Sequence, residues 1–348
     1  MSKHHGKHRR DQTLGETEAS ASQRDVSHRK DAAHRKSGLK GKKGEARRAG
    51  HRPPSSAHWA REAESRGGMA HVSVDPRLAP AATGIVTVRP GTRCDLGLID
   101  ADADGGLDKD AAKAALASER ARIAALQERL YAEHARSLLV VFQAIDTGGK
   151  DGTIRAVFEG VNPQGCRVWS FKVPSAEESD HDFLWRYHAK APARGMINVF
   201  NRSHYEDVLV VRVKDLVPEP VWRERYGQIN DFERMLSAAG TTVLKFFLHI
   251  SKDEQRERLE ARIANPEKHW KFDPADLVER RSWDAYQAAF ADALSECSTG
   301  QAPWHVVPAN RKWYRNLLIA RTIADTLEAM DPRFPEAKAD IAGLTVPD

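Results

Sequence analysis

The sequence predicts an α/β fold in three layers, with a parallel β-sheet between helices on both faces. One observation behind this prediction is a series of short, continuously apolar runs, typical of strands that are buried on both faces. The other is that stretches with helical spacing separate these runs, and alternating strands and helices are the pattern of parallel sheets. The expected strands lie at residues 138–142, 165–171, 196–200, 241–250 and 304–308.

Helix signals lie between the expected strands. Asp108 can cap a long helix from residue 109 to about residue 135, where apolar residues recur at helical spacing. Ser175 and Glu178 form a capping-box pattern for a helix that stops by Pro192. Further helices are expected over residues 220–239, 252–259, 274–294 and 312–330.

A glycine-rich turn with a lysine follows the first expected strand. The apolar run from Leu138 breaks into Gly148-Gly149-Lys150, and helical spacing resumes over residues 154–160. A strand followed by a glycine loop with a lysine and then a helix is the local structure typical of phosphate-binding sites. The loop N–H groups and the helix N-terminus point at the anion, and the lysine adds a full positive charge.

This loop departs from the usual pattern G-x-x-x-x-G-K-[ST] at two positions. Ala144 occupies the first glycine position, and Asp151 follows Lys150 where a Ser or Thr usually binds Mg²⁺. A carboxylate, Asp146, also stands inside the loop. The alternative interpretation is an ordinary strand-to-helix turn with an incidental lysine.

A second polar cluster follows the expected strand 196–200. Asn201, Arg202, Glu206 and Asp207 come directly after it. Because open parallel sheets bind ligands at the carboxyl ends of their strands, these side chains are expected beside the phosphate loop if the two strands are neighbours. A simple polar helix start is the alternative interpretation.

Composition excludes several classes of protein. Hydrophobic residues make up 41% and charged residues 30% of the 348 residues, which allows a sizeable core with a well-solvated surface. The longest apolar runs are too short to span a bilayer, and the first thirty residues lack the apolar core of a signal peptide. Cys94, Cys166 and Cys297 show no paired spacing, so these cysteines fit neither a disulfide framework nor a metal knuckle. We therefore expect the reducing environment of the cytoplasm.

The net charge of +5 is unevenly distributed along the chain. Residues 1–68 carry 17 Lys+Arg against 8 Asp+Glu, whereas 37 of the 54 basic and 41 of the 49 acidic residues follow. We expect residues 1–70 to be a disordered basic tail, because they are polar and nearly free of large apolar residues. The tail is either an arm that attracts polyanions or a solubilising extension.

We expect one domain over residues 71–335, followed by a C-terminal tail at 336–348. Residues 71–107 are expected to be extended, because prolines there forbid long helices. Between two core strands, residues from about 251 to 295 form two charged helices in a hairpin, a pattern that resembles a lid with cations to clamp phosphates. A solvated helical hairpin is the alternative interpretation.

Six motifs follow one another in the sequence. They are Asp146-Thr147-Gly148-Gly149-Lys150-Asp151-Gly152-Thr153-Ile154, Gly160-Val161-Asn162-Pro163-Gln164-Gly165, Phe171-Lys172-Val173-Pro174, His181-Asp182-Phe183-Leu184-Trp185-Arg186, Asn201-Arg202-Ser203-His204-Tyr205-Glu206-Asp207 and Ser251-Lys252-Asp253-Glu254-Gln255. In this order they resemble the family-2 polyphosphate kinases, and the resemblance covers roughly residues 75–330. It implies a phosphate-loop kinase fold that moves phosphate between inorganic polyphosphate and nucleotides with Mg²⁺ or Mn²⁺. It also implies a homo-oligomer.

One motif subdivides the family. Many members have an aspartate where this chain has Asn201, and the Asn-Arg-Ser-His-Tyr-Glu-Asp form resembles the subgroup that phosphorylates both nucleoside mono- and diphosphates, class III. Ala144 stands where the family usually has glycine, and the basic tail has no counterpart in the family core.

Phosphoryl transfer needs two polyanions held in line and their repulsion neutralised. We expect Lys150 and the N–H groups of residues 148–152 to hold phosphates at the transfer point. Asp146 would hold Mg²⁺ or orient the attacking nucleotide oxygen, and Glu206 would share the metal or act on the acceptor. Arg202 would stabilise charge on the transferred group. The further expected phosphate- and nucleotide-binding residues are Gly148, Gly149, Asp151, Gly152, Thr153 and Asn201, with Lys172, Lys252 and Arg256 along the polyphosphate path and lid.

Two other functions compete with this hypothesis. One is a nucleotide kinase that uses ATP as donor and no polyphosphate. The other is a non-enzymatic polyanion- or RNA-binding module led by the basic tail. The acidic balance of the chain after residue 68 argues against the second.

Overall fold

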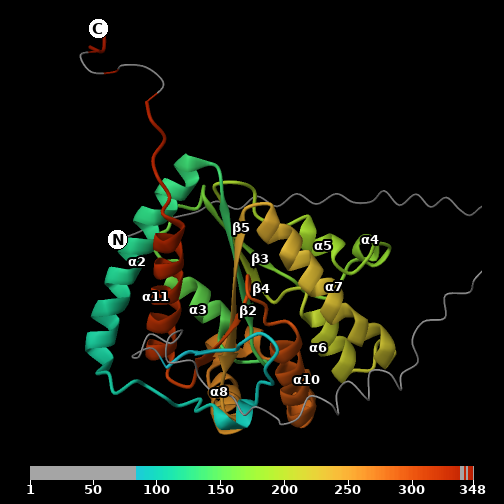
Figure 1. The fold of residues 1–348 in the computed structure, drawn as a ribbon. Helices are drawn as coiled ribbons and strands as arrows, with labels where there is room; N and C mark the ends of the chain where they lie inside the picture. Colours follow the sequence, from blue (N-terminus) through green and yellow to red (C-terminus); the bar gives the residue numbers. More distant parts are fainter. Residues whose placement is uncertain (1–83, 338–340, 342–343, 348) are drawn as a thin grey trace, which may run out of the picture. The chain divides into compact units, whose positions relative to one another are not determined.

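The computed structural model describes residues 84–337, 341 and 344–347 of the chain (Figure 1). The predicted basic tail of residues 1–70 lies outside these described residues. A six-stranded sheet forms the centre of the described part, in the order β1-β6-β5-β2-β4-β3. The strands are β1 Val86–Thr87, β2 Ser137–Gln143, β3 Cys166–Ser170, β4 Ile197–Asn201, β5 Thr241–His249 and β6 Trp304–Pro308.

The predicted α/β class is confirmed. Strands β2 to β6 pair in parallel, and β1 alone pairs antiparallel, with β6. Strand β2 lies between β4 and β5, and all seven of its residues are buried, as its continuous apolar run predicts. Because β4 is the direct neighbour of β2, the loops after these two strands leave the same edge of the sheet.

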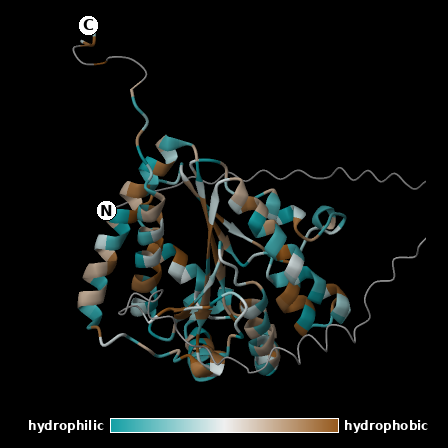
Figure 2. Cartoon of the chain, viewed as in Figure 1, coloured by the Kyte–Doolittle hydropathy of each residue, from teal (hydrophilic) through white to brown (hydrophobic). Residues whose placement is uncertain are grey.

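Helices cover both faces of the sheet (Figure 1). On one face α2, α3 and α11 pack together, and on the other α6, α7 and α10 do so. Apolar colours follow the strands between these two layers (Figure 2). The helices are η1 Leu96–Leu98, α2 Lys109–Glu133, α3 Lys150–Val157, α4 Ala176–Ser179, α5 Trp185–His188, α6 Glu206–Val213, α7 Glu219–Ala238, α8 Lys252–Ile263, η2 Pro266–Lys271, α9 Ala275–Arg281, α10 Trp283–Glu296 and α11 Lys312–Met330.

The caps predicted from sequence are present. The side chain of Asp108 accepts hydrogen bonds from the backbone N–H groups of Asp110 and Ala111 at the start of α2. Ser175 and Glu178 form the reciprocal capping box at α4. The helix predicted from Ser175 to before Pro192 is wrong in its middle. Asp182 accepts a bond from the backbone N–H of Leu184, and this turn separates α4 from α5.

The lid region differs in part from the prediction. The single helix expected over residues 274–294 is two helices, α9 and α10, with a break at Ser282. Helix α10 belongs to the packed layer, because Trp283 is buried and the Phe290 ring lies 4.5 Å from that of Phe247 on β5, centroid to centroid. A lid over these residues is therefore confined to α8, η2 and α9.

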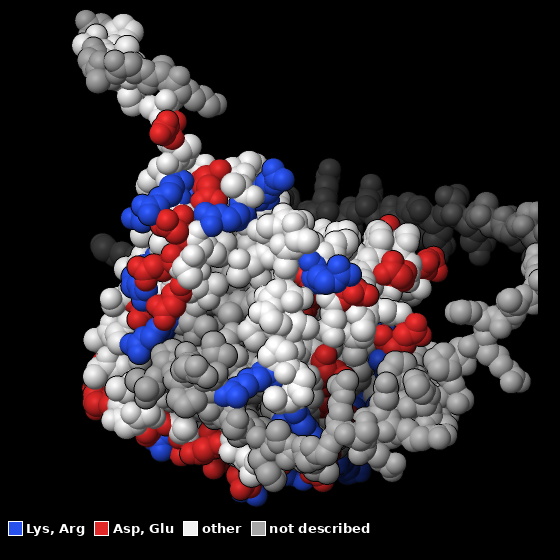
Figure 3. Space-filling view, viewed as in Figure 1, with Lys and Arg blue, Asp and Glu red and all other residues white. Residues whose placement is uncertain are grey.

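The surface over α2 and α11 carries acidic and basic side chains next to one another (Figure 3). Arg122 of α2 binds Asp325 and Glu328 of α11 at 3.0 and 2.5 Å, and these pairs cross between the two helices. Within the described part of the chain, none of the helices combines the length and the apolarity that a bilayer span requires.

Candidate active site

Two cavities meet at the carboxyl ends of β2 and β4. The larger one, about 590 Å³, is lined by the glycine loop of residues 146–152 and by the first residues after β3 and β4. The smaller one, about 200 Å³, lies on the side of α6 and α10. Asp146, Arg202 and Asp276 line both. Lys150 and Arg202 therefore share one cavity, as the sequence hypothesis requires.

Buried side chains hold the carbonyl groups of the glycine loop from behind. Arg258 of α8 donates through one nitrogen to the carbonyl oxygens of Thr147 and Gly148, each at 3.0 Å. Gln255 of the same helix donates to the carbonyl oxygen of Asp146 at 3.0 Å. Because these carbonyl groups are engaged on the side of α8, the loop is fixed in one conformation before any ligand binds.

Glycine is required at two positions of this loop. Gly149 has φ +98°, and a Cβ there would collide with the guanidinium of Arg315. A Cβ at Gly148 would lie 2.5 Å from the Cβ of Ala144. The methyl group of Ala144, the departure from the usual loop pattern, is therefore accommodated because Gly148 has no side chain.

Helix α3 begins inside the larger cavity. Its N-cap residue, Gly149, offers no side chain to the first turn, so the N–H groups of Lys150, Asp151 and Gly152 are free to bind an anion. The N–H of Gly148 instead donates to the carbonyl oxygen of Ile145 at 2.9 Å. This part of the predicted phosphate-binding loop is engaged within the protein.

Lys150 is buried beneath the loop. Its ammonium group donates to the carbonyl oxygen of Ala144 at 2.9 Å. Burial and the positive charge of Arg202 lower the pKa of Lys150 to about 8. A bound phosphate would oppose both effects, so Lys150 is poised to gain an anionic partner.

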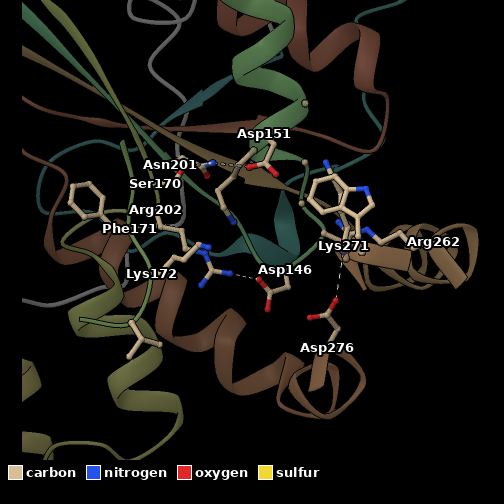
Figure 4. A pocket seen from close by; sticks show the side chains of 17 residues that line it. Asp146, Asp151, Ser170, Phe171, Lys172, Asn201, Arg202, Arg262, Lys271 and Asp276 are labelled. Carbon is tan, nitrogen blue, oxygen red and sulfur yellow. Dashed lines mark hydrogen bonds and ion pairs between the residues drawn. The ribbon is translucent and has the colours of Figure 1, made fainter. Parts of the chain in front are cut away.

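Arg202 bridges the two carboxylates that the sequence singled out. It donates to Asp146 at 2.7 Å (Figure 4). Its other terminal nitrogen lies 3.9 Å from a carboxylate oxygen of Glu206. Its backbone adopts the left-handed region, at φ +63°. Such a conformation is costly for a residue other than glycine, and it is often found at functional sites.

The neighbouring residues Asn201 and Asp151 are joined across the two loops. The Asn201 amide donates to Asp151 at 2.7 Å, which links the end of β4 to the first turn of α3. Thr153, another predicted binding residue, is fully buried and donates to the carbonyl oxygen of Gly149 at 3.0 Å. Thr153 thus supports the loop and does not line the cavity.

The opposite wall of the larger cavity comes from the lid region. Arg262 of α8 and Lys271 of η2 lie on that wall, across from Lys172 and Arg202 (Figure 4). Asp276 of α9 lies 3.6 Å from Arg262. Five cationic side chains therefore surround a glycine loop with free N–H groups, and a negatively charged chain fits such a cavity. They are Lys150, Lys172, Arg202, Arg262 and Lys271.

The smaller cavity has different walls. Seven of its fifteen lining residues are apolar or aromatic, and the other eight are charged or polar, five of them carboxylates. The Tyr286 hydroxyl donates to Glu279 at 2.8 Å. Glu206 lines this cavity and not the larger one. The apolar and aromatic lining residues are Ala144, Ile145, Leu209, Val210, Ala275, Tyr286 and Phe290.

Besides Thr153, two predicted binding residues lie outside both cavities. Lys252 and Arg256 are on the exposed face of α8, where Arg256 pairs with Asp253 at 3.3 Å. The cation of α8 that reaches the larger cavity is Arg262, one turn beyond the predicted helix. All the other predicted site residues lie in the loop or line a cavity.

The sequence reasoning missed the residues that hold the loop from behind. Arg258 and Gln255 of α8 are buried, as is Arg315 of α11, which lies against Gly149. Leu259, next to Arg258, is the first large apolar residue of α8. The face that it shares with Gln255 could have been predicted as the buried one.

Among the described residues, no group of three or more His, Cys, Asp or Glu side chains comes together in a way that could hold a metal ion. Asp146 and Glu206 are the two carboxylates that flank Arg202. Both offer the hard oxygen ligands that Mg²⁺ prefers. Since Mg²⁺ commonly takes one or two protein carboxylates and completes its shell with substrate phosphates and water, this donor set fits the ion.

Comparisons with known proteins agree with this geometry. A family model described as Polyphosphate kinase 2 matches residues 106–335. The chain is 55% identical over 251 residues to the AMP/ADP-polyphosphate phosphotransferase of Meiothermus ruber, a match that covers 72% of this chain and 94% of that protein. It is 49% identical over 227 residues to the ADP-polyphosphate phosphotransferase of Rhodopseudomonas palustris, with 62% and 78% covered. The crystal structure of polyphosphate kinase 2 from Arthrobacter aurescens matches with a TM-score of 0.71 and 44% identity, over 73% of this chain and 92% of that one.

Proposed function

The chain belongs to the polyphosphate kinase 2 family, and on that premise we propose that it transfers the terminal phosphoryl group of inorganic polyphosphate to AMP and ADP, reversibly. GMP and GDP are further candidate acceptors. The chain is thus a phosphotransferase that uses polyphosphate where other nucleotide kinases use ATP.

The observation that carries this proposal is the meeting of two unlike cavities at one ion pair. The larger cavity has five cations and free loop N–H groups, which suit a phosphate chain. The smaller one combines apolar and aromatic side chains with polar and charged ones, a mixture that suits a nucleoside. At the Asp146–Arg202 pair, which lines both, the end of the chain and the nucleotide phosphate would meet in line.

Each residue then has a role in a direct transfer without a phosphoenzyme. Lys150 and the first N–H groups of α3 would hold the donor phosphate. Arg202 would move from Asp146 to the transferred group and stabilise the charge on its oxygens. Glu206, on the nucleotide side, would orient the acceptor.

We propose Mg²⁺, or Mn²⁺, as the metal, held by Asp146 and Glu206 together with substrate phosphates. When bound, the ion would neutralise part of the charge on the two polyanions. The carboxylates would then be released from Arg202, which becomes available to the phosphates. We also propose self-association, which light scattering would test, and a cytoplasmic location, for which the free cysteines are one support.

Incubation with polyphosphate and AMP, ADP, GMP or GDP, without any ATP donor, tests the proposal. We expect ADP or ATP to form, and their absence would favour a kinase that needs ATP or a protein that only binds polyanions. Lys150→Ala and Asp146→Asn should each lower the rate by at least about a hundredfold. Near wild-type rates in either variant would contradict the site assignment.

A further inference from the structure

A buried polar cluster lies behind the loop that carries Arg202. Lys245 of β5 and Glu233 of α7 are both fully buried, and their side chains meet at 2.6 Å. Neither residue lines either cavity of the active site. This pair has no part in the roles assigned above.

The two charged groups are fully hydrogen-bonded, although among the described residues the Nδ1 of the neighbouring His204 has no hydrogen-bond partner. The Lys245 ammonium donates to Glu233, to the Tyr205 hydroxyl at 2.8 Å and to the Cys297 carbonyl oxygen at 2.6 Å. The second oxygen of Glu233 accepts from the Tyr205 hydroxyl at 2.8 Å and from His204 at 3.1 Å. A lysine has three donors, and all three are used here.

His204 and Tyr205 connect this cluster to the active site. They stand between Arg202 and Glu206 in the chain, and both are fully buried. Burial lowers the pKa of His204, so its neutral ring donates to the Glu233 carboxylate. Within the segment 201–206, the residues at both ends thus line a cavity, and the three between them, residues 203–205, are buried behind it.

Ser203 adds a second anchor to the same segment. The Gln143 side chain, at the end of β2, donates to the Ser203 hydroxyl at 3.2 Å. Arg202 donates from its backbone N–H to the carbonyl oxygen of Phe142 at 3.2 Å. The strained backbone of Arg202 is therefore held by anchors immediately before and after it.

Stability alone is a weak reason for such a cluster. Desolvation of a buried ion pair offsets most of its attraction, and apolar replacements of such pairs are often neutral or stabilising. The cluster instead fixes the orientation of side chains. Lys245 and Glu233 belong to rigid elements, and their hydrogen bonds hold His204 and Tyr205 in one arrangement.

We propose that Lys245, Glu233, His204 and Tyr205 are positioning residues that hold Arg202 and Glu206 in register with the phosphate loop. This inference rests on the proposed phosphotransfer. A loosened cluster would leave the protein folded and still able to bind both substrates. Arg202 would, however, be displaced from the reacting phosphate, and a misplacement of about 1 Å can cost about a hundredfold in rate.

Tyr205→Phe and the pair His204→Ala and His204→Gln test this inference. We expect Tyr205→Phe and His204→Ala to lower kcat by about ten- to a hundredfold, with both KM values changed less than about threefold. His204→Gln should retain most of kcat, because an amide N–H can take the place of the ring N–H. Should His204→Ala fail to fold, Tyr205→Phe and His204→Gln still decide the matter.

Hydrogen exchange of the segment 199–209 gives a readout that is independent of activity. Tyr205→Phe should speed exchange in this segment. Ile123→Ala, in a fully buried position of α2, is the control, since it should lower stability without altering either this exchange or kcat. Unchanged kcat and exchange in Tyr205→Phe and His204→Ala would overturn the inference. A wild-type protein without phosphotransfer would overturn the proposed function, and the exchange data would still test the positioning role.

Discussion

The two cavities of the active site share one wall and differ in every other. The larger, about 590 Å³, is lined by five cations, loop N–H groups and three carboxylates, whereas the smaller, about 200 Å³, combines apolar and aromatic side chains with five carboxylates. A flexible polyanionic chain suits the larger cavity, and a compact aromatic base suits the smaller one. Under the proposed function, the site would recognise its two substrates by different physical means.

The position of a residue relative to the shared wall should decide whether its substitution changes kcat or KM. Apart from Lys150 and Glu206, which act at the transfer point, residues that line only one cavity should affect the KM of one substrate, because their contacts exist before and during the reaction. Residues at the shared Asp146–Arg202 pair should affect kcat, because they act where the substrates meet. The predictions below follow this division.

Arg202→Ala should have the largest effect. Loss of the guanidinium removes charge stabilisation from the transferred group, and we expect kcat to fall by about a thousandfold. Both KM values should change by less than about threefold. Initial rates with polyphosphate and ADP varied independently measure this split. Arg223→Ala, in an exposed ion pair on α7, is the matched control and should leave the rate unchanged. A large change in only one KM would assign Arg202 to one cavity. It would contradict the division between a shared wall that affects kcat and separate walls that affect KM.

The pH dependence should come from the larger cavity. Lys150 binds phosphate as a cation, and its pKa of about 8 in the free enzyme means that the charge is present below pH 8 and lost above it. We therefore expect kcat/KM for polyphosphate to fall about tenfold per pH unit above 8. At saturation the bound phosphates raise this pKa, so the fall in kcat should begin at higher pH.

A profile from pH 6.5 to 9.5 measures both curves. Lys150→Arg keeps its charge over this range and should remove the fall, even if its overall rate is lower. A wild-type kcat/KM that stays level to pH 9.5 would show that the charge of Lys150 is not needed for binding.

Substitutions of Lys172 and Tyr286 should each raise the KM of a different substrate. Lys172 lines the larger cavity only, and Lys172→Ala should raise the KM for polyphosphate by about three- to tenfold. Tyr286 lines the smaller cavity only, and Tyr286→Ala should raise the KM for the nucleotide by about tenfold. Each should leave the other KM unchanged, as steady-state kinetics would measure. A Tyr286→Ala variant that weakens polyphosphate instead would move the nucleotide out of the smaller cavity.

The sequence predicted the fold and two residues of the shared wall, Asp146 and Arg202, but not the third, Asp276. Continuous apolar runs identify buried strands, and the glycine loop and the motif after β4 fall at the carboxyl ends of neighbouring strands. The antiparallel strand β1 could not be predicted, because two residues, Val86 and Thr87, carry no periodicity. The break at Ser282 likewise interrupts a stretch whose composition is helical throughout.

The sequence could not predict which polar side chains point into the core and which partners they bind there. In the strand 241–250 a single lysine, Lys245, stands among apolar residues, and only its neighbours in space reveal a bonded ion pair with Glu233. In α8, charged residues fill almost every position, so composition did not separate the buried Arg258 from the exposed Arg256. The helix register, fixed by Leu259, is the information that was needed.

The exposed face of α8 gives the smallest expected effect. Lys252 and Arg256 lie outside the cavities, so a short phosphate chain would not reach them, whereas a long chain that leaves the larger cavity could pass over this face. We expect the double variant Lys252→Ala, Arg256→Ala to raise the KM for long polyphosphate by about two- to threefold and to leave that for tripolyphosphate unchanged. Because exposed charges are screened by salt, the difference should disappear at about 0.5 M NaCl. Kinetics at two chain lengths and two salt concentrations measure it, with Lys113→Ala on the exposed surface of α2 as control. An equal rise in the KM for tripolyphosphate would show that the polyphosphate site extends to this face. If neither KM rises, the long chain leaves the larger cavity by another path.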